Sequence, residues 1–248
     1  MKILKEILAR IFALWALIVF FITMLPVALA IWIIGMIEEP RRIKLYIKIS
    51  KIWMTIFFAA SGCRVKIIGK ENFKSGENYI VVCNHNSLMD VPLSTPFIPG
   101  ANKTIAKIEM AKIPVFGLIY KRGSILVDRK DKNSRKQSFV KMKEVLSMGV
   151  HMCIYPEGTR NTTDQPLREF HDGAFKLALD TQKSLLPAII FNTKKVLPPG
   201  KLFYFWPSKM ELHFLPPVAP TDTDSPESLK QKVFTLMSKY YSENYKLL

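Results

Sequence analysis

A long uncharged run near the start of the chain restricts its fold more than any other feature. No charged residue occurs from Ile11 to Ile37, and these 27 residues are long enough, in helical form, to cross the hydrocarbon core of a bilayer. Pro26 lies within the run and is expected to kink or break the helix. A soluble helical hairpin is the alternative, but an uncharged run of this length is unusual in a soluble helix.

The same run has some features of a secretory signal peptide. Lys2, Lys5 and Arg10 precede it, and residues 28–30 read ALA, which resembles a cleavage site. Glu6 weakens the basic start, however, and the apolar run continues past the supposed site. We therefore expect the segment to remain in the protein as a membrane element.

A second helix with a basic stripe is predicted directly after this run. Arg41, Lys44, Lys48 and Lys51 are spaced by three and four residues, which places them on one helical face among apolar neighbours. Such a helix suits a membrane interface. Both flanks of the first run are positive, so the positive-inside rule gives no clear direction. Together with Pro26, this favours a helical hairpin that enters one leaflet and returns, with a single span as the alternative.

The pattern changes from Cys63 onward, where apolar runs of strand length alternate with amphipathic stretches. We predict strands at 65–69, 79–83, 103–108, 124–128, 150–156, 185–191 and 210–218, and helices at 134–149, 172–183 and 226–247. This alternation predicts an α/β fold with a mixed, largely buried sheet flanked by helices. We therefore divide the chain into an N-terminal membrane-associated hairpin, 1–62, and an α/β domain, 63–248.

The charge balance restricts the partners of the chain. It has 36 basic and 20 acidic residues, a net charge of +16, which indicates an anionic partner: nucleic acid, an anionic membrane surface or a phosphorylated substrate. The apolar N-terminal run argues against nucleic acid. The three cysteines form no CxxC pair, so neither a zinc site nor a disulfide framework is predicted.

The polar segment NHNSLMD at 84–90 directly follows a predicted strand. His85 carries the side chain best suited to accept a proton near neutral pH, and Asp90 could fix its tautomer if the chain turns into a helix there. The alternative is that Asn84 or Ser87 caps a helix and His85 is structural.

Two further polar segments follow predicted strands. In YPEGTRNTTD at 155–164, Gly158 allows a tight turn, Arg160 suits a phosphate, and Glu157 could accept hydrogen bonds from an acceptor substrate or hold an arginine. Arg129 ends the strand at 124–128 and could point into the same cleft. An ordinary turn with a surface ion pair is the alternative.

No GxSxG, P-loop or HExxH motif occurs in the sequence. A base without a protein nucleophile suggests that a hydroxyl of the substrate attacks directly.

Taken in order, these segments resemble the glycerolipid acyltransferase family, especially its members that acylate lysophosphatidic acid. The family motif NHxSxxD resembles NHNSLMD, and its EGTR motif matches 157–160. GSILVDR at 123–129, LLPAII at 185–190 and AKIEMAKIPVFG at 106–117 resemble further family segments.

The resemblance implies an enzyme that transfers an acyl chain from acyl-CoA or acyl-ACP to the sn-2 hydroxyl of lysophosphatidic acid, giving phosphatidic acid without an acyl-enzyme. His85 would be the general base and Asp90 its orienting acid. The acceptor phosphate would be held by Arg129, Arg160 and Lys107. The other site residues would be Asn84, Ser87, Glu157, Gly158 and Thr159.

Several further expectations follow from this resemblance. No metal or cofactor is required, an apolar tunnel or groove would take the acyl chain, and the domain would lie on the cytoplasmic side of the cell membrane. Backbone N–H groups near Asn84 to Ser87, or after Gly158, are candidates for stabilising the oxyanion. The open alternatives are glycerol-3-phosphate or another lysophospholipid as acceptor, a membrane-attached thioesterase that uses water, and a non-catalytic lipid-binding module.

Overall fold

A seven-stranded sheet forms the centre of the computed structural model, which describes residues 2–245. Its strands, in chain order, are β1 (Arg64–Ile68), β2 (Ile80–Cys83), β3 (Asn102–Lys107), β4 (Ser124–Val127), β5 (His151–Ile154), β6 (Leu185–Phe191) and β7 (Lys209–Phe214). All seven predicted strands are confirmed, with ends that differ by a few residues. The strand order across the sheet is β1-β7-β6-β2-β5-β3-β4.

The sheet is mixed, as predicted. β2 pairs in parallel with β5 and β6, and β3 pairs in parallel with β5 and β4. β7 is antiparallel to β6 and parallel to β1. Every residue of β2, β5 and β6 is buried, which explains why these strands read as continuous apolar runs rather than alternating ones. The carboxyl ends of β2, β3, β4 and β5 therefore meet at one edge of the sheet, where sites form in such folds.

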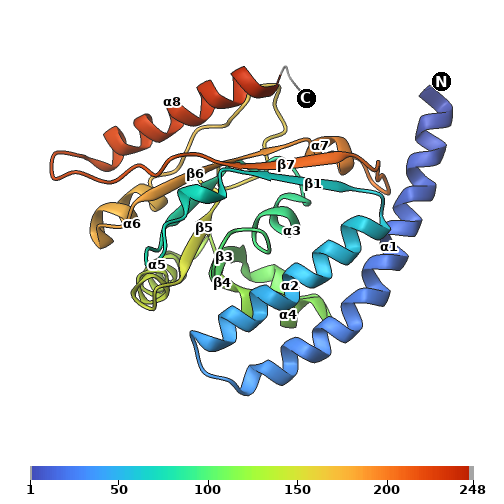
Figure 1. Cartoon of the computed structure of the whole chain (residues 1–248), viewed down its shortest axis with the longest axis horizontal. Coiled ribbons are helices and arrows are strands. Elements are labelled where there is room, and N and C mark those ends of the chain that lie inside the picture. Colours follow the sequence, from blue (N-terminus) through green and yellow to red (C-terminus); the bar gives the residue numbers. More distant parts are fainter. Residues whose placement is uncertain (1, 246–248) are drawn as a thin grey trace.

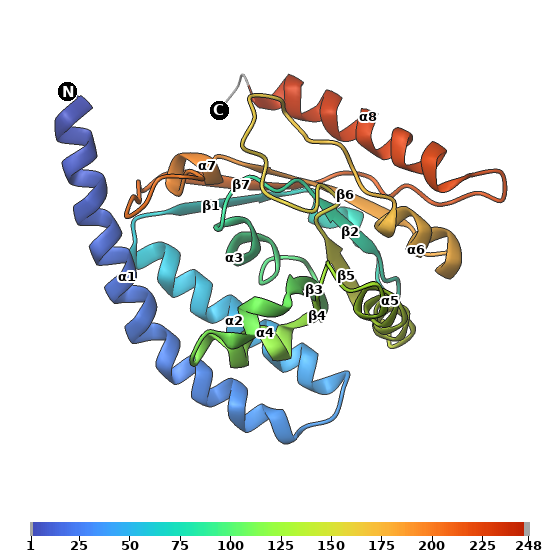
Figure 2. The ribbon, with the colours of Figure 1, turned by 180° about the vertical axis from the view of Figure 1, so that it is seen from behind.

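Helices cover both faces of the sheet (Figures 1 and 2). One face carries α5 (Lys132–Ser147), α6 (Gly173–Thr181) and α8 (Pro226–Tyr245). The other face carries α2 (Arg41–Ala60), α3 (Asp90–Ser94) and α4 (Phe116–Gly123), and α1 (Lys2–Ile33) lies outside α2 and α4. The short elements are η1 (Ile34–Met36), η2 (Lys70–Asn72), η3 (Ile108–Lys112) and α7 (Thr193–Val196). The predicted C-terminal helix is confirmed to Tyr245, and its last two predicted residues lie outside the described part of the chain.

The N-terminal segment is a helical hairpin, but its turn is not at the proline. α1 continues through Pro26, and the chain reverses between Ile34 and Pro40. Of the two effects expected of Pro26, a kink or a break, the break is therefore wrong. Packing explains the difference, because α1 contacts α2 and α4 and buries Met24 before Pro26 and Ala28 and Ile31 after it. This packing holds the helix together despite one lost backbone hydrogen bond.

Polar contacts and packing tie the hairpin to the rest of the molecule. The indole N–H of Trp53 donates to Thr23 at 2.9 Å between the two helices. In the turn, Glu39 forms an ion pair at 2.6 Å with Lys103 of β3. Phe57 and Phe58 of α2 belong to the same buried cluster as the strands. The hairpin is thus part of the hydrophobic core, and the division at residue 62 stays a prediction.

The outer face of α1 is apolar and exposed. The exposed large side chains of its middle and end are Ile11, Leu14, Trp15, Leu17, Ile18, Phe21, Ile22, Leu25, Leu29, Trp32 and Ile33. The segment Ile3–Met36 is the one helix in the described residues that is long and apolar enough to cross a membrane. On α2, the basic stripe of Arg41, Lys44, Lys48 and Lys51 is exposed on one face, as predicted.

Candidate active site

His85 lies just beyond the end of β2, in a loop that is anchored to the neighbouring strand. The side chain of Asn84 accepts from the N–H of Ile190 at 2.7 Å and donates to its carbonyl at 3.0 Å, which fastens the loop to β6. The imidazole Nδ1 of His85 is 2.8 Å from Oδ2 of Asp90. Because Nδ1 faces a carboxylate, it carries the proton, and the lone pair of Nε2 is free to act as a base.

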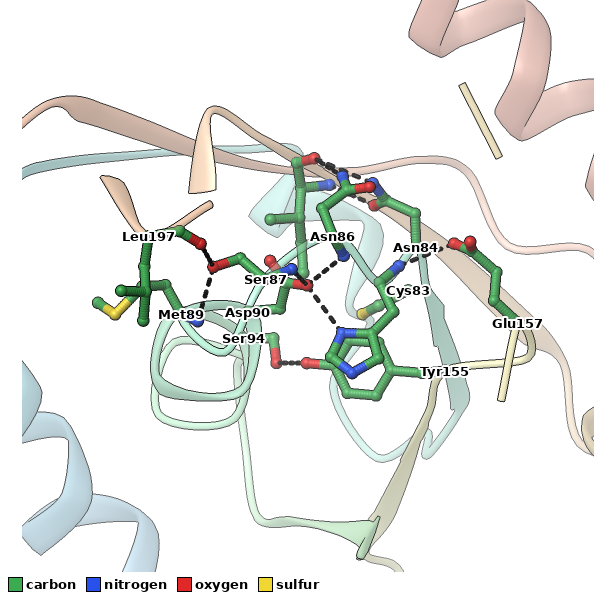
Figure 3. A network of polar contacts seen from close by, with 12 residues as sticks. Cys83, Asn84, Asn86, Ser87, Met89, Asp90, Ser94, Tyr155, Glu157 and Leu197 are labelled. Carbon is green, nitrogen blue, oxygen red and sulfur yellow. Dashed lines mark hydrogen bonds and ion pairs between the residues drawn. The ribbon is translucent and has the colours of Figure 1, made fainter. Parts of the chain in front are cut away.

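Asp90 is the first residue of α3 and is completely buried. Its Oδ2 accepts from the backbone N–H groups of Asn86 and Ser87, in addition to the contact with His85 (Figure 3). Ser87 in turn accepts from the N–H of Met89 at 3.2 Å and donates to the carbonyl of Leu197 at 2.6 Å. Ser87 thus stabilises the turn that brings Asp90 back to His85. Since α3 has no side-chain cap, the alternative in which Asn84 or Ser87 caps a helix is wrong, and the catalytic role of the pair stays a prediction.

Glu157 supports the same loop from the side of β5. Its Oε1 accepts the backbone N–H of His85 at 2.8 Å, and its Oε2 accepts the backbone N–H of Arg168 at 3.1 Å. Burial raises the pKa of Glu157 to about 7, against the opposing effect of these two hydrogen bonds. Glu157 therefore positions the backbone of His85, a role that the sequence did not suggest.

An aromatic ring packs directly against the imidazole. The ring of Tyr155 lies 4.5 Å from that of His85, and its hydroxyl is 2.6 Å from the hydroxyl of Ser94 on α3. Burial keeps the pKa of Tyr155 well above its ordinary value, so the phenol stays neutral beside the base. The only sequence signal for this role is the position of Tyr155, at the end of a strand and just before Glu157.

A cleft of about 530 Å³ opens in front of His85. It is lined by residues from the ends of β3, β4 and β5, among them Lys107, Arg129, Gly158, Thr159 and Arg160. The guanidinium of Arg129 donates to the carbonyl of Gly158. The structure therefore brings both predicted arginines, Lys107 and His85 into one cleft.

The cations of this cleft are not neutralised by acidic side chains. Within residues 2–245, neither Lys107, Arg129 nor Arg160 forms an ion pair at 4.0 Å or less. Burial lowers the pKa of Arg129, while the charge of Glu109 raises it. Unpaired arginines beside a base are suited to bind an anionic group, and the guanidinium fork matches phosphate oxygens.

Gly158 has a backbone conformation that few other residues adopt. Its φ is +67°, and a Cβ atom there would come within 2.9 Å of Nε2 of His171. Thr159 and Arg160, which follow it, line the cleft, and no described residue accepts from their backbone N–H groups. By contrast, the N–H groups of His85, Asn86 and Ser87 are already occupied. The position after Gly158 therefore has the unoccupied N–H groups, and its role as an oxyanion donor stays a prediction.

A second, apolar cavity adjoins the cleft on the side of the hairpin. Val91, Thr104 and Tyr120 line both, and the cavity continues between Phe20, Trp53, Met54 and Phe116. The hairpin, α3 and α4 thus enclose an apolar space of about 70 Å³ next to the cleft. The use of this space by an acyl chain stays a prediction. No group of three or more potential metal ligands occurs in residues 2–245, and the expectation that no metal takes part stays a prediction.

Comparison with known proteins agrees with this site. Residues 64–191, more than half of the chain, match the family model described as Acyltransferase. The chain belongs to this acyltransferase family. The match spans His85, Asp90 and all the predicted phosphate contacts, and it confirms the resemblance seen in the sequence.

Several curated relatives of the chain are themselves named as acyltransferases. The 1-acyl-sn-glycerol-3-phosphate acyltransferase of Helicobacter pylori is 30% identical over 75% of this chain and 78% of its own length. The human 1-acyl-sn-glycerol-3-phosphate acyltransferase alpha is 31% identical over 68% of this chain and 59% of its own.

A solved structure resembles almost the whole molecule. The acyltransferase matches PlsC, the 1-acyl-sn-glycerophosphate acyltransferase of Thermotoga maritima, with a TM-score of 0.81, 26% identity, and coverage of 98% of this chain and 97% of that one. Since the match includes the hairpin as well as the sheet, the mixed α/β fold with its long apolar N-terminal helix is the fold of this relative.

Proposed function

We propose that this acyltransferase moves an acyl chain from a thioester donor to the sn-2 hydroxyl of lysophosphatidic acid, which yields phosphatidic acid. The observation that carries the proposal is the position of the His85–Asp90 pair between unpaired cations and an apolar cavity. Relatives named for this reaction support it.

The cations suit the acceptor because its reacting hydroxyl and its phosphate are close together. In lysophosphatidic acid, the free hydroxyl and the phosphate are on adjacent carbons, so the phosphate must bind near Nε2 of His85. Arg160 is next to Asn161, whose backbone N–H donates to the carbonyl of His85 at 2.6 Å. The guanidinium of Arg129 donates to the carbonyl of Gly158, which lies two residues before Arg160. Binding the phosphate at these arginines, with Lys107 beside them, would place the hydroxyl at the base.

The chemical steps follow from this placement. Nε2 of His85 takes the proton of the acceptor hydroxyl while the hydroxyl oxygen attacks the thioester carbonyl carbon. Asp90 stabilises the imidazolium that forms. The tetrahedral oxyanion is stabilised by the N–H groups of Thr159 and Arg160, each worth roughly 3 to 4 kcal/mol in comparable sites. The intermediate collapses, the carbon–sulfur bond breaks, and the leaving thiolate takes the proton back from His85.

The apolar cavity and the exposed face of α1 give this reaction its lipid surroundings. The cavity between the hairpin and α4 would hold the acyl chain, which begins at the carbonyl in front of His85. The apolar outer face of α1 would enter one leaflet of the cell membrane, with the α/β domain on the cytoplasmic side. Anchoring in this way brings the cleft to acceptors and products that are themselves lipids.

The test is an acyl-transfer assay with the purified full chain in detergent. Acyl-CoA and acyl-ACP are each offered with lysophosphatidic acid, glycerol-3-phosphate, lysophosphatidylcholine or water alone. We expect phosphatidic acid as the main product. Faster transfer to glycerol-3-phosphate or lysophosphatidylcholine would identify that compound as the acceptor in place of lysophosphatidic acid. Thioester hydrolysis that is as fast without any acceptor as with one would identify a thioesterase.

A charge-removing variant tests the phosphate site. Arg160→Gln should raise the KM for lysophosphatidic acid by about 10- to 100-fold, the range for losing a hydrogen bond to a charged group. The KM for the donor should change little. An unchanged acceptor KM would remove Arg160 from the phosphate site.

A further inference from the structure

The cleft contains more positive charge than the acceptor needs. Besides Lys107, Arg129 and Arg160, its lining includes Arg135 from the first turn of α5. His171, just before α6, lines the same wall. A phosphate monoester has at most two negative charges, which the first three cations already balance. Arg135 and His171 are therefore available for a second anionic group.

Arg135 is unpaired, like the other cations of the cleft. It forms no ion pair with an acidic residue among residues 2–245. Its neighbours in the lining are Ser138 on the next turn of α5 and Gly173 and Ala174 at the start of α6. We call these five residues, Arg135, Ser138, His171, Gly173 and Ala174, the α5–α6 wall. The wall offers the guanidinium of Arg135, the imidazole of His171 and the hydroxyl of Ser138 beside two small residues.

The α5–α6 wall is on the opposite side of the molecule from the membrane hairpin. α5 and α6 pack on one face of the sheet, whereas α2 and α4 pack on the other and α1 lies outside them (Figure 1). The apolar cavity leaves the cleft toward the hairpin, through Val91, Thr104 and Tyr120. The cleft therefore has a lipid side and a basic side, and the basic side faces away from α1.

The acceptor phosphate and the second anionic group bind at different distances from His85. The sheet order places β5 and β3 between β2, which carries His85, and β4, which leads into α5. Three strand spacings amount to about 14 Å between the ends of β2 and β4. Arg129 also follows β4, but its guanidinium reaches back to the carbonyl of Gly158 beyond β5, whereas Arg135 has no described hydrogen bond to that loop. The acceptor phosphate must be next to His85, since it is on the carbon adjacent to the hydroxyl. The phosphate of an acyl donor is different, because a long uncharged pantetheine arm separates it from the thioester.

We propose that the α5–α6 wall binds the phosphate of the donor's phosphopantetheine arm, with Arg135 as its main contact. This inference rests on the proposed function, in which an acyl thioester is the donor. The arm runs from the carbonyl at His85 to Arg135, while the acyl chain enters the apolar cavity. The same phosphate chemistry occurs in coenzyme A, which has further phosphates, and in acyl carrier protein, where the arm is attached through a phosphodiester.

The experiment measures equilibrium binding without an acceptor, so that it does not depend on transfer to lysophosphatidic acid. Coenzyme A, holo-acyl carrier protein and phosphate-free pantetheine are titrated into the purified full chain. Arg135→Gln is compared with Lys136→Gln, which removes the same charge from the next position of the helix, outside the lining of the cleft. Arg135→Lys keeps the charge. Thermal unfolding of each variant shows that it is folded.

We expect Arg135→Gln to weaken coenzyme A binding by about tenfold or more, the effect of losing one charge-assisted hydrogen bond. Lys136→Gln should bind like the wild type, Arg135→Lys should recover part of the affinity, and pantetheine should not distinguish the variants. A loss confined to holo-acyl carrier protein also supports the site and identifies that donor. Unchanged affinity for both phosphorylated ligands would overturn the proposal, as would an equal loss for pantetheine.

A kinetic comparison separates this site from the acceptor site. Arg135→Gln should raise the donor KM and leave the KM for lysophosphatidic acid unchanged, the reverse of Arg160→Gln. If Arg135→Gln raises the acceptor KM instead, Arg135 belongs to the acceptor site and the inference is overturned. If the wild type binds coenzyme A through Arg135 but acylates another acceptor, the proposed function is wrong while the donor site remains.

Discussion

The backbone N–H of His85 donates a hydrogen bond to the carboxylate of Glu157 at 2.8 Å, across 72 residues of sequence. This contact joins the loop after β2 to the loop after β5. The same carboxylate accepts the N–H of Arg168, so one buried side chain holds three segments of the site together. The EGTR segment thus contributes a positioning residue as well as the proposed phosphate contact.

Glu157 should make stability depend on pH. Burial raises its pKa to about 7, from about 4.3 in an unfolded chain. Between these values the unfolded chain loses the proton first, so stability falls as pH rises from about 4.3 to 7 and then levels off. The shift corresponds to about 4 kcal/mol in total. Glu157→Gln should lack this decline, which thermal midpoints at pH 5 and pH 8 would reveal. Parallel pH profiles for the two proteins would contradict this role for Glu157.

The His85–Asp90 pair should determine turnover rather than folding. His85→Ala removes the base and should abolish acyl transfer, while the protein stays folded and membrane-bound. Asp90→Asn should lower kcat by about three to four orders of magnitude, the loss seen when the orienting acid of a catalytic histidine is neutralised. Steady-state kinetics and circular dichroism check both variants. Near-normal turnover of folded His85→Ala would rule out the mechanism.

Val91 should influence which acyl chains are accepted. It lies on α3 at the junction of the cleft and the apolar cavity. Val91→Phe narrows this junction, so long-chain donors should lose more activity than short-chain ones, at about 0.8 kcal/mol for each excluded methylene. Val91→Ala is the control, and it should leave long chains unaffected. Competition between donors of 8 and 16 carbons measures the preference, and an unaltered ratio in Val91→Phe would place the acyl chain elsewhere.

The exposed face of α1 should bind membranes. Ile22 and Leu29 are 66% and 58% exposed, so replacing both with lysine should leave the fold unchanged. Each lost side chain removes about 1.5 to 3 kcal/mol of burial in lipid, which predicts at least a tenfold weaker binding to anionic vesicles for each residue. Val140→Lys, at a 55% exposed position on α5, is the matched control. Equal sedimentation of all three proteins with vesicles would argue against this surface.

Much of the fold could be predicted from the sequence because its signals are local. The buried strands appear as short continuous apolar runs, and all seven were found at their observed positions. The pairing of His85 with Asp90 was also predictable, because five residues of chain that turn into α3 bring them together. The path of α1 was not, since contacts with α2 and α4 outweigh the local effect of Pro26.

The remaining parts of the site depend on contacts between distant segments. Nothing near Tyr155 in the sequence indicates that its ring packs on His85, and nothing near Arg135 indicates that it lines the cleft. Both follow from the strand order β2-β5-β3-β4, which places the loops after β2, β4 and β5 at one edge of the sheet. The sequence by itself determined the elements and the pairing of His85 with Asp90, because short stretches of chain encode them. Only the tertiary structure decided which loops meet around the base, because strand order depends on packing across the whole core.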